Sequence, residues 1–419
     1  MRLRRRMMLT LAALAGLAGC AGPEIVNRAC PGLVSGSGAP VILSAMNGGP
    51  VGAPPPAPGE AVAERMSRLV AAQAARTPET VMAQPAAIAL EALRAPTRKV
   101  VRINLLAMTT GGQYGAFSSG FMTGWTESGR RPDFAVVTGA SAGGVVAPLV
   151  FAGPEFDDRL RLNAGIGTGD VVRRRSVLEL LGASSLFSTA PLQRAVQAAV
   201  DDRLVKAIAA RWRAGNDLFL GATNLDQGRF ELFDIGAFAA MEGVPAGVKR
   251  DCLVGAVMAT SAIPGLFPPK RIGGDLYTDA GVRQSVFLRG VRDGIRDSER
   301  ALGIDVRVTA TLLVNSDLMV RVARTETGLL DLAGRTFTLV SDEGLRESLV
   351  ETVDLAQASG WRLRAAVAPD FETLGCGEDD DLFSACVTDK LFEAGRAMAT
   401  APRIAWLSGR QLRDLARRF

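Results

Sequence analysis

The pattern of apolar and polar positions changes near residue 98. From RKVVRINLLAMTTGG (98–112) onward, continuous apolar runs alternate with amphipathic stretches, which is typical of buried strands followed by helices. PDFAVVTGAS (132–141) and DVRVTATLLVN (305–315) are predicted strands, and AGGVVAPLVFAG (142–153) and GLRESLVETVDLAQASG (344–360) are predicted helices. This alternation predicts an α/β fold with a mainly parallel sheet.

The segment before residue 98 has a different composition. GGPVGAPPPAPGE (48–60) is rich in proline and glycine, so it predicts a tether or an extended segment lying over the domain. EAVAERMSRLVAAQAAR (60–76) predicts one exposed helix, ended by Thr77 and Pro78. We therefore expect an N-terminal extension over 20–97, a folded domain over 98–410 and a C-terminal tail over 411–419.

The first 19 residues are typical of an export signal. Arginines precede MMLTLAALAGLAG (7–19), an apolar run too short for the roughly 20 residues that span a bilayer. LAGC (17–20) resembles the cleavage box of bacterial lipoproteins, which implies cutting before Cys20 and acylation of that cysteine. Ala21 after it suggests the outer membrane, so we expect a lipid-anchored protein of the cell envelope. An ordinary signal peptide with a coincidental cysteine is the alternative.

Composition and charge narrow the classes of function. The chain has 419 residues, 48% of them hydrophobic, which is enough for one large α/β core or for two modest ones. Its formal charge of +5 includes four arginines of the signal segment, and without them the charge is close to neutral. A nearly neutral mature chain gives no support to nucleic-acid binding.

GASAG (139–143) is the first candidate for chemistry. It lies between a predicted strand and a predicted helix, where a Gly-x-Ser-x-Gly turn exposes its serine, Ser141, beside the helix N-terminus. Gly139 and Gly143 relieve the crowding of such a sharp turn. A tight turn without catalytic function has the same pattern. The chain contains no histidine, so a Ser-His-Asp triad is excluded.

TTGGQYGAFSSGFMTGW (109–125) is the second candidate. Its glycines, Gly111, Gly112 and Gly115, follow a predicted strand about 30 residues before Ser141, a distance that fits one parallel crossover. The backbone N–H groups of Gly112 and Gln113 would then point at an oxyanion formed on an ester attacked by Ser141. A phosphate-binding loop lacks its Lys-Ser/Thr, and a dinucleotide fingerprint lacks its third glycine at the right place. A plain turn with close helix packing remains an alternative.

MATSAIPGLFPPKRIGGDLYTDAGV (258–282) contains a short predicted strand that ends at Asp279. Together the three stretches resemble the patatin-like phospholipases, acyl hydrolases that use a Ser–Asp dyad and no histidine. LFLGATNLDQGRFELFD (218–234) is similar to the strand-turn-strand region of that family. The resemblance covers roughly 98–410 and implies a three-layer α/β/α fold.

The resemblance also implies roles for individual residues. Ser141 is the expected nucleophile, Asp279 its partner, and Gly111, Gly112, Gln113 and Gly115 the oxyanion loop. No cofactor and no metal is implied, and the expected substrate is a phospholipid or another acyl ester.

Two of the motifs, the glycine loop and the aspartate motif, depart from the family pattern. Thr110 occupies the first glycine position of the loop, Tyr114 replaces a basic residue, and Ala280 follows the aspartate where glycine is usual.

A Ser-Lys enzyme is an alternative, although no lysine follows Ser141 at the short Ser-x-x-Lys spacing. A non-catalytic lipid-binding lipoprotein with the same fold is the other alternative.

The remaining cysteines give a separate expectation. An exported chain meets oxidising conditions. Cys376 and Cys386 flank a polar acidic loop and are predicted to pair, whereas Cys252 in the apolar run CLVGAVMA is predicted to be a reduced core residue. Phenylalanine and methionine in SGFMTGW and GLFPP are candidates for an acyl pocket, with core packing as the other role.

Overall fold

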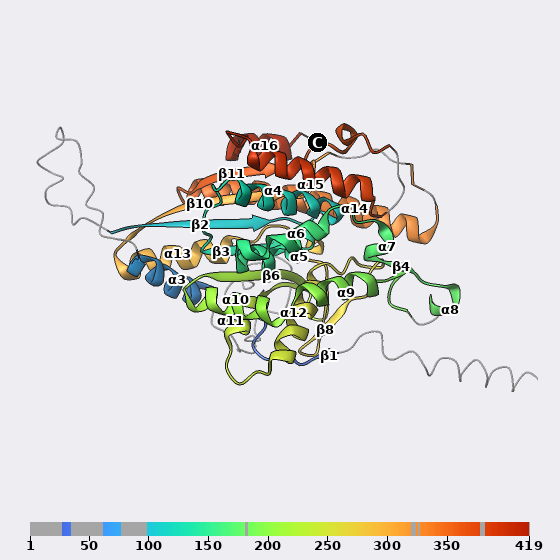
Figure 1. Cartoon of the computed structure of the whole chain (residues 1–419), viewed down its shortest axis with the longest axis horizontal. Coiled ribbons are helices and arrows are strands. Elements are labelled where there is room, and N and C mark those ends of the chain that lie inside the picture. Colours follow the sequence, from blue (N-terminus) through green and yellow to red (C-terminus); the bar gives the residue numbers. More distant parts are fainter. Residues whose placement is uncertain are drawn as a thin grey trace, which may run out of the picture.

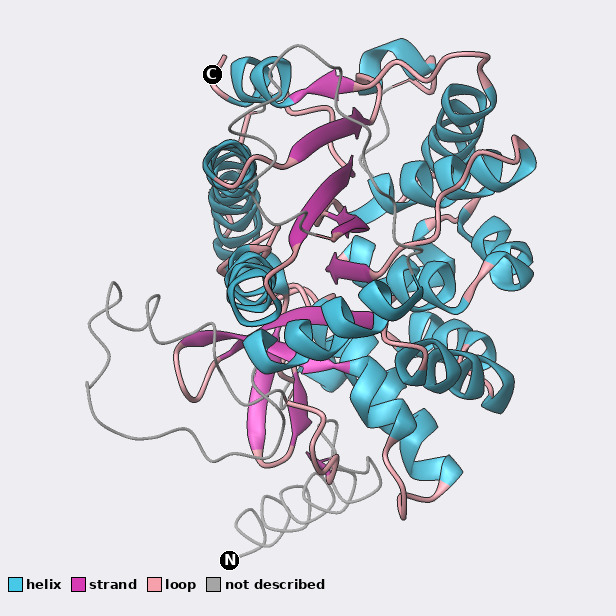
Figure 2. Cartoon of the chain, turned by 90° about the vertical axis from the view of Figure 1, so that its left-hand side faces the viewer, coloured by secondary structure: helices cyan, strands magenta, loops and turns pink. Residues whose placement is uncertain are grey.

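The computed structural model describes residues 27–34, 62–76, 99–180, 183–319, 324–325, 327–377 and 382–418. Residues 1–19, where an export signal is expected, Cys20 and the proline-rich stretch 48–60 lie outside these ranges. The described residues form a central sheet with helices on both faces (Figures 1 and 2), so the predicted α/β fold with a mainly parallel sheet is confirmed.

The strands are β1 (Asn27–Arg28), β2 (Val100–Met108), β3 (Val136–Ala140), β4 (Arg173–Arg174), β5 (Phe187–Ser188), β6 (Asp217–Asn224), β7 (Arg229–Asp234), β8 (Lys270–Ile272), β9 (Asp275–Thr278), β10 (Asp305–Val314), β11 (Arg362–Val367) and β12 (Leu407–Ser408). The helices are α3 (Val62–Arg76), α4 (Gly115–Glu127), α5 (Ala142–Ala152), α6 (Asp157–Leu160), α7 (Thr168–Val171), α8 (Val177–Leu180), α9 (Ala190–Ala199), α10 (Asp202–Arg213), α11 (Ile235–Ala240), α12 (Ala246–Thr260), α13 (Arg289–Leu302), α14 (Leu329–Ala358), α15 (Ala385–Thr400) and α16 (Gly409–Ala416).

The order of the strands decides which loops meet. Across the main sheet it is β1-β8-β9-β6-β3-β2-β10-β11-β12, and β7 pairs with β6. Strands β6, β3, β2, β10 and β11 run parallel, and Met108 of β2 lies opposite Gly139 of β3 and Leu313 of β10. Because the carboxyl ends of parallel strands share one edge, the loops after β2, β3 and β10 lie together there.

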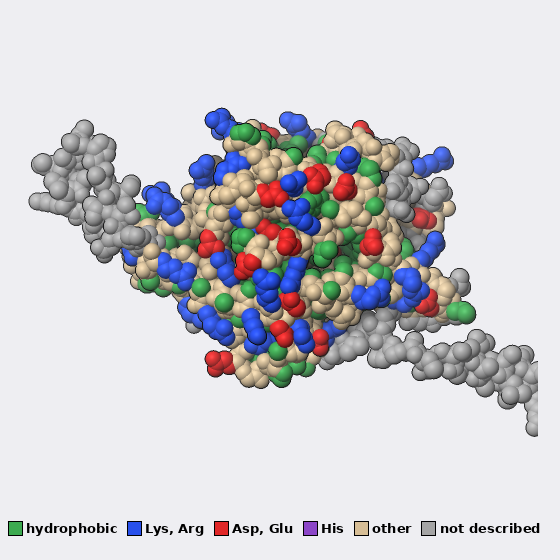
Figure 3. All heavy atoms as spheres, viewed as in Figure 1, with side chains coloured by type: hydrophobic (Ala, Val, Ile, Leu, Met, Phe, Trp, Pro, Cys, Tyr) green, Lys and Arg blue, Asp and Glu red, His purple; other side chains and the backbone are tan. Residues whose placement is uncertain are grey.

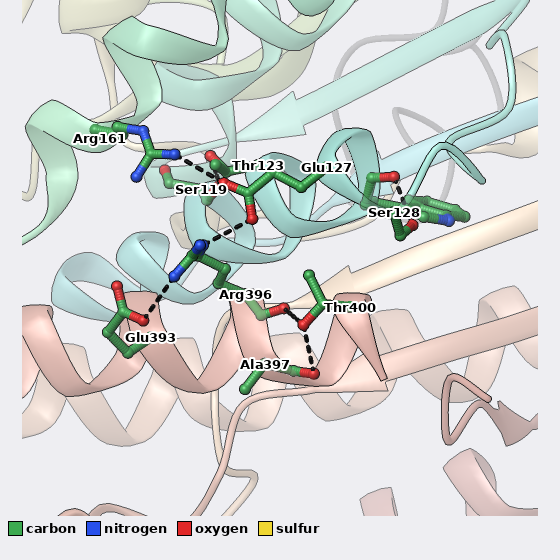
Figure 4. Close-up of polar contacts among 10 residues, drawn as sticks. Ser119, Thr123, Glu127, Ser128, Arg161, Glu393, Arg396, Ala397 and Thr400 are labelled. Atoms are coloured by element: carbon green, nitrogen blue, oxygen red, sulfur yellow. Dashed lines mark hydrogen bonds and ion pairs between the residues drawn. The ribbon is translucent and has the colours of Figure 1, made fainter. Parts of the chain in front are cut away.

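Each face of the sheet has its own layer of helices. Helices α4, α5, α12 and α15 pack around the larger apolar core on one face, and α3, α13, α14 and α16 cover the other. Helix α15 runs along α4, and Glu127 accepts hydrogen bonds from Arg161 at 2.7 Å and Arg396 at 2.8 Å (Figure 4). The close approach of α15 to α4 requires glycine at position 120, because a Cβ there would lie 1.8 Å from the carbonyl oxygen of Phe392. Residues near 390 are thus an integral part of the domain.

The ends of the chain are packed more closely than the sequence suggested. Helix α3 was expected to be exposed, yet Met66, Leu69 and Val70 are buried against β2 and α13. Their i, i+3, i+4 spacing gives α3 one apolar face, which the neighbouring charges obscured. The predicted C-terminal tail is also wrong over 411–416, because Leu412 and Ala416 of α16 are buried against α14.

Two disulfides join described cysteines. Cys376 pairs with Cys386, as predicted from the sequence. Cys252 is paired with Cys30, so the prediction of a reduced Cys252 is wrong. The pairing of β1 with β8 brings Cys30 to α12, with 5.7 Å between the two Cα atoms. The two positions are 222 residues apart, and no local pattern relates them.

Within the described ranges, no helix combines the length and the hydropathy needed to cross a bilayer.

Candidate active site

Ser141 lies in a sharp turn between β3 and α5. Its backbone has φ 50° and ψ −119°, a conformation that is strained for any residue with a Cβ. The turn is close to β2, since the N–H of Gly143 donates to the carbonyl of Thr109 at 3.1 Å. A Cβ on Gly143 would lie 2.3 Å from the carbonyl oxygen of Met108. Glycine is therefore required there, and the strained turn presents Ser141 at the carboxyl edge of the sheet.

Asp279 follows β9 and faces Ser141. The Ser141 hydroxyl donates to Oδ2 of Asp279 at 2.7 Å, and the backbone N–H of Gly281 donates to Oδ1 at 2.7 Å. Ser141 is 6% exposed and Asp279 2%. The two residues that the sequence singled out, 138 positions apart, are thus joined in a buried pair.

Burial changes the acidity of this carboxyl group. Loss of hydration raises the pKa of Asp279 to about 6, and the hydrogen bonds from Ser141 and from the Gly281 N–H oppose this rise. The carboxylate is therefore a stronger base than an exposed aspartate and remains mostly ionised at neutral pH.

Two threonines that the sequence did not single out hold the pair in place. The backbone N–H of Ser141 donates to Oγ1 of Thr260 at 3.0 Å, and the Thr260 hydroxyl donates to the carbonyl of Gly221. Thr223 donates to the backbone carbonyl of Asp279 at 2.9 Å. Both threonines are buried. A lone buried threonine has no signature in the sequence that would have marked it.

The glycine loop after β2 borders the same site. Gly111 has φ 154° and Gly112 φ 55°, and a Cβ on Gly111 would lie 1.7 Å from the carbonyl oxygen of Asn315. The N–H of Gly115 is used inside the loop, because it donates to the carbonyl oxygens of Gly112 and Gln113. Gly115 instead provides close packing, since a Cβ there would lie 3.0 Å from that of Ala142. Gly112 and Gln113 line the site beside Ser141.

The C-terminal part of the chain anchors this loop through side chains. The Tyr114 hydroxyl donates to Oδ2 of Asp317 at 2.7 Å, and the backbone N–H of Ser384 donates to Oε1 of Gln113 at 3.1 Å. The Asn315 side chain donates to the carbonyl of Thr109 at 2.9 Å. Tyr114, which departs from the family pattern, therefore has a defined partner. Nothing in the sequence pointed to Asn315, Asp317 or Ser384.

Two chambers meet at Ser141, and both also touch Gly112, Gln113 and Ile263. The first has a volume of about 80 Å³ and is mostly apolar; its further lining includes Val145, Val146, Ile166, Val171, Leu192, Phe267 and Phe383. Phe267 comes from the GLFPP stretch, whereas Phe121 and Met122 of SGFMTGW lie in the core.

The second chamber has a volume of about 350 Å³ and a mixed lining that is more polar than that of the first; its polar side chains include Tyr114, Asp279, Asn315, Asp317, Arg335, Thr338, Ser341 and Asp342. Oδ1 of Asn315 and Oγ of Ser341 are buried there, and neither has a hydrogen-bond partner among the described residues. A substrate with hydroxyl or amide groups would satisfy them.

The described side chains include no group of three histidine, cysteine, aspartate or glutamate residues suited to a metal ion.

The comparisons with known proteins cover part of the chain. No curated protein matches the sequence. Among solved structures, the crystal structure of VipD from Legionella pneumophila is similar, with 12% identity, 75% of this chain and 68% of that chain covered, and a TM-score of 0.35. The patatin-like phospholipase family matches residues 106–291, a range that includes Ser141, Asp279 and the glycine loop. Residues 106–291 are thus similar to the patatin-like phospholipases.

Proposed function

We propose that the protein is a serine-dependent lipid acyl hydrolase, of the phospholipase A or lysophospholipase/esterase type, with Ser141 and Asp279 as its catalytic dyad. The observation that carries this proposal is the 2.7 Å hydrogen bond from the Ser141 hydroxyl to the buried Asp279 carboxylate. The family of the domain, whose members act on lipid esters, supports the same class of substrate.

In this mechanism Ser141 Oγ attacks the acyl carbonyl carbon while Asp279 Oδ2 takes the hydroxyl proton. The carbonyl oxygen becomes an oxyanion, stabilised by the N–H groups of Gly112 and Gln113 and by the N-terminus of α5. The carbon–oxygen bond of the ester then breaks, and protonated Asp279 returns the proton to the departing alcohol. Water repeats the cycle on the acyl-enzyme, with Asp279 again as the base, and releases the fatty acid.

The different linings of the two chambers indicate how a substrate would be oriented in the site. An acyl chain gains free energy by leaving water, so it belongs in the apolar chamber beside Val145 and Phe267. The alcohol portion belongs in the larger polar chamber, where Asn315 and Ser341 offer unsatisfied hydrogen-bonding atoms. The carbonyl carbon between them would then lie at Ser141, which borders both chambers.

We also propose that the chain is exported and anchored in the cell envelope through acylated Cys20, at the outer membrane. The sequence LAGC and the two disulfides, which are typical of an oxidising compartment, support this location. Cys20→Ser is expected to abolish labelling with radioactive palmitate, because the thiol is the atom that the lipid attaches to. Labelling that persists in Cys20→Ser would rule out this anchor.

Turnover of a chromogenic short-chain ester tests the hydrolase. Ser141→Ala, Asp279→Asn and the double variant are expected to lose nearly the same activity, since each removes one half of a single attack step. Ser359→Ala, at the end of α14, is the matched control and is expected to keep full activity. Mass spectrometry of products from mixed lipids would then identify the ester that is cleaved.

The alternative function, a lipid-binding lipoprotein without catalysis, predicts a different outcome. The unchanged protein would then bind lipid but give no more product than Ser141→Ala. Full turnover by Asp279→Asn beside an inactive Ser141→Ala would instead assign the base to another residue.

A further inference from the structure

Exposed apolar side chains are unevenly distributed over the molecule. Nine large apolar side chains are exposed in the described ranges, and six of them lie on α8, on the first half of α14, or at Met319, which lines the second chamber. Leu178 and Leu180 belong to α8, and the other four are Met319, Leu332, Leu339 and Val340. Both α8 and the start of α14 lie at the end of the molecule toward which β2 points (Figure 1). Apolar side chains gathered around one entrance are typical of an interaction site.

The first segment is a hairpin with a fixed base and a projecting tip. Strands β4 and β5 pair antiparallel, and the backbone N–H groups of Leu186 and Phe187 donate to the carbonyls of Gly265 and Leu266 at 2.9 and 3.0 Å. Phe187 also packs in an apolar cluster with Phe267, which lines the apolar chamber. The hairpin is thus continuous with the wall of that chamber, while α8 extends into solvent, where Leu178 is 74% exposed.

The hairpin is also basic. Arg173, Arg174 and Arg175 precede α8, and Glu179 is the acidic residue beside them. Arg173 donates to Glu179 at 2.7 Å, which leaves a formal charge of about +2 on this segment at neutral pH. Figure 3 shows this projection on the right, with basic side chains behind a hydrophobic outer end. In an anionic bilayer the apolar acyl chains lie beneath a layer of charged phosphates. Leucines at the tip of the hairpin and arginines behind them have the same order, so they fit such a surface.

The second segment has two different faces. Thr338, Ser341 and Asp342 of α14 line the polar chamber. Leu332 and Leu339, which are 46% and 44% exposed, lie two turns apart and therefore share one face of the helix. The side of α14 toward the chamber also carries Phe337 and Leu345, whereas Leu332 and Leu339 give its outer side an exposed apolar pair that can meet lipid.

We propose that the α8 hairpin and the outer face of the first half of α14 dock on the surface of a bilayer that contains anionic lipid. Leu178, Leu180, Leu332 and Leu339 enter the boundary between head groups and acyl chains, and Arg174 interacts with lipid phosphates. Docking in this way holds both chambers against the membrane, so that a lipid reaches Ser141 without crossing bulk water. The docking goes beyond the proposed hydrolase and requires no catalysis.

Vesicle flotation of the full chain tests the proposal, with Cys20→Ser in every sample so that no acyl anchor is attached. Vesicles are made of phosphatidylcholine with or without phosphatidylglycerol. Leu178→Ser is expected to weaken binding to the mixed vesicles about tenfold, because the leucine no longer leaves water on docking. Arg174→Gln is expected to weaken binding about fivefold on the mixed vesicles and not on phosphatidylcholine alone.

Matched controls lie at the other edge of the sheet. Leu302 is 47% exposed at the end of α13, and Arg300 is exposed on the same helix. Leu302→Ser and Arg300→Gln are expected to leave vesicle binding unchanged. Since residues 1–26 are common to all samples, differences between variants report the docking surface.

Binding of Leu178→Ser and Arg174→Gln equal to that of the controls would overturn the proposal. So would dimers in sedimentation that Leu178→Ser dissociates while vesicle binding is unaffected, because the apolar tip would then be an interface with a second copy. Hydrolysis gives an independent measurement: the hairpin variants are expected to keep turnover of a soluble ester and lose turnover of lipid in vesicles. If no ester is cleaved but the vesicle results hold, the hydrolase proposal fails and the docking proposal stands.

Discussion

Replacement of Asp279 by asparagine is expected to stabilise the fold at neutral pH while abolishing hydrolysis. Burial raises the pKa of the carboxyl group from its ordinary 3.8 to about 6. A difference of that size corresponds to about 3 kcal/mol between folded and unfolded states. Asparagine carries no charge, and its amide can accept from the Gly281 N–H and donate to Ser141. The variant removes the buried charge and keeps both hydrogen-bonded contacts.

The sign follows from the direction of the pKa shift. Below pH 3.8 both states are protonated, and Asp279 does not destabilise the fold. As the pH rises from 3.8 to about 6, Asp279 ionises in the unfolded chain before it ionises in the folded protein. This difference lowers the free energy of unfolding, and the decrease is complete above the folded pKa. The stability advantage of Asp279→Asn should therefore be about 0.5 kcal/mol at pH 4 and about 3 kcal/mol at pH 7 and above.

Urea unfolding followed by tryptophan fluorescence measures this difference between pH 4 and pH 8. Asp389→Asn, an exposed position on α15, is the control and is expected to track the unchanged protein at every pH. Equal stability of Asp279→Asn and the unchanged protein at pH 7 would show that the Asp279 charge is not buried as described. In the same range, hydrolysis by the unchanged protein should decline below about pH 6, because the base must be ionised.

Two other substitutions test how the site and the N-terminal helix are held. Arg65 is 2% exposed and donates to Asp217 and to Asp234, so Arg65→Met is expected to lower the free energy of unfolding by about 3–5 kcal/mol. Burial raises the pKa of Asp217 to about 7; the loss in urea unfolding should therefore be larger at pH 8 than at pH 5, and a loss independent of pH would contradict this reasoning. Tyr114→Phe removes the hydrogen bond to Asp317 and is expected to lower kcat about tenfold at constant KM, since the loop positions the transition state more than the substrate. A change in KM alone, measured by steady-state turnover of the soluble ester, would assign Tyr114 to substrate binding.

The sequence alone indicated the parts of the site that depend on local geometry. The GASAG turn needs its glycines because strand and helix meet there at short distance, and that requirement is visible in five consecutive residues. The strands before Ser141 and after Arg98 are continuous apolar runs because both faces of the sheet are covered. Asp279 was assigned from a resemblance between motifs, and the structure places it 2.7 Å from Ser141.

Only the tertiary structure decided which distant groups support those residues. Asp317 and Ser384 reach the glycine loop because β10 lies beside β2 and because α15 packs on α4. Arg65 donates hydrogen bonds to two buried aspartates, and Cys30 forms a disulfide with Cys252. Both Arg65 and Cys30 lie in segments that precede the predicted domain in the sequence. A local pattern records the periodicity and the turns of its own segment, which follow from backbone geometry. The neighbours of that segment are set by the burial of apolar surface over the whole chain, so they can be read only from the folded molecule.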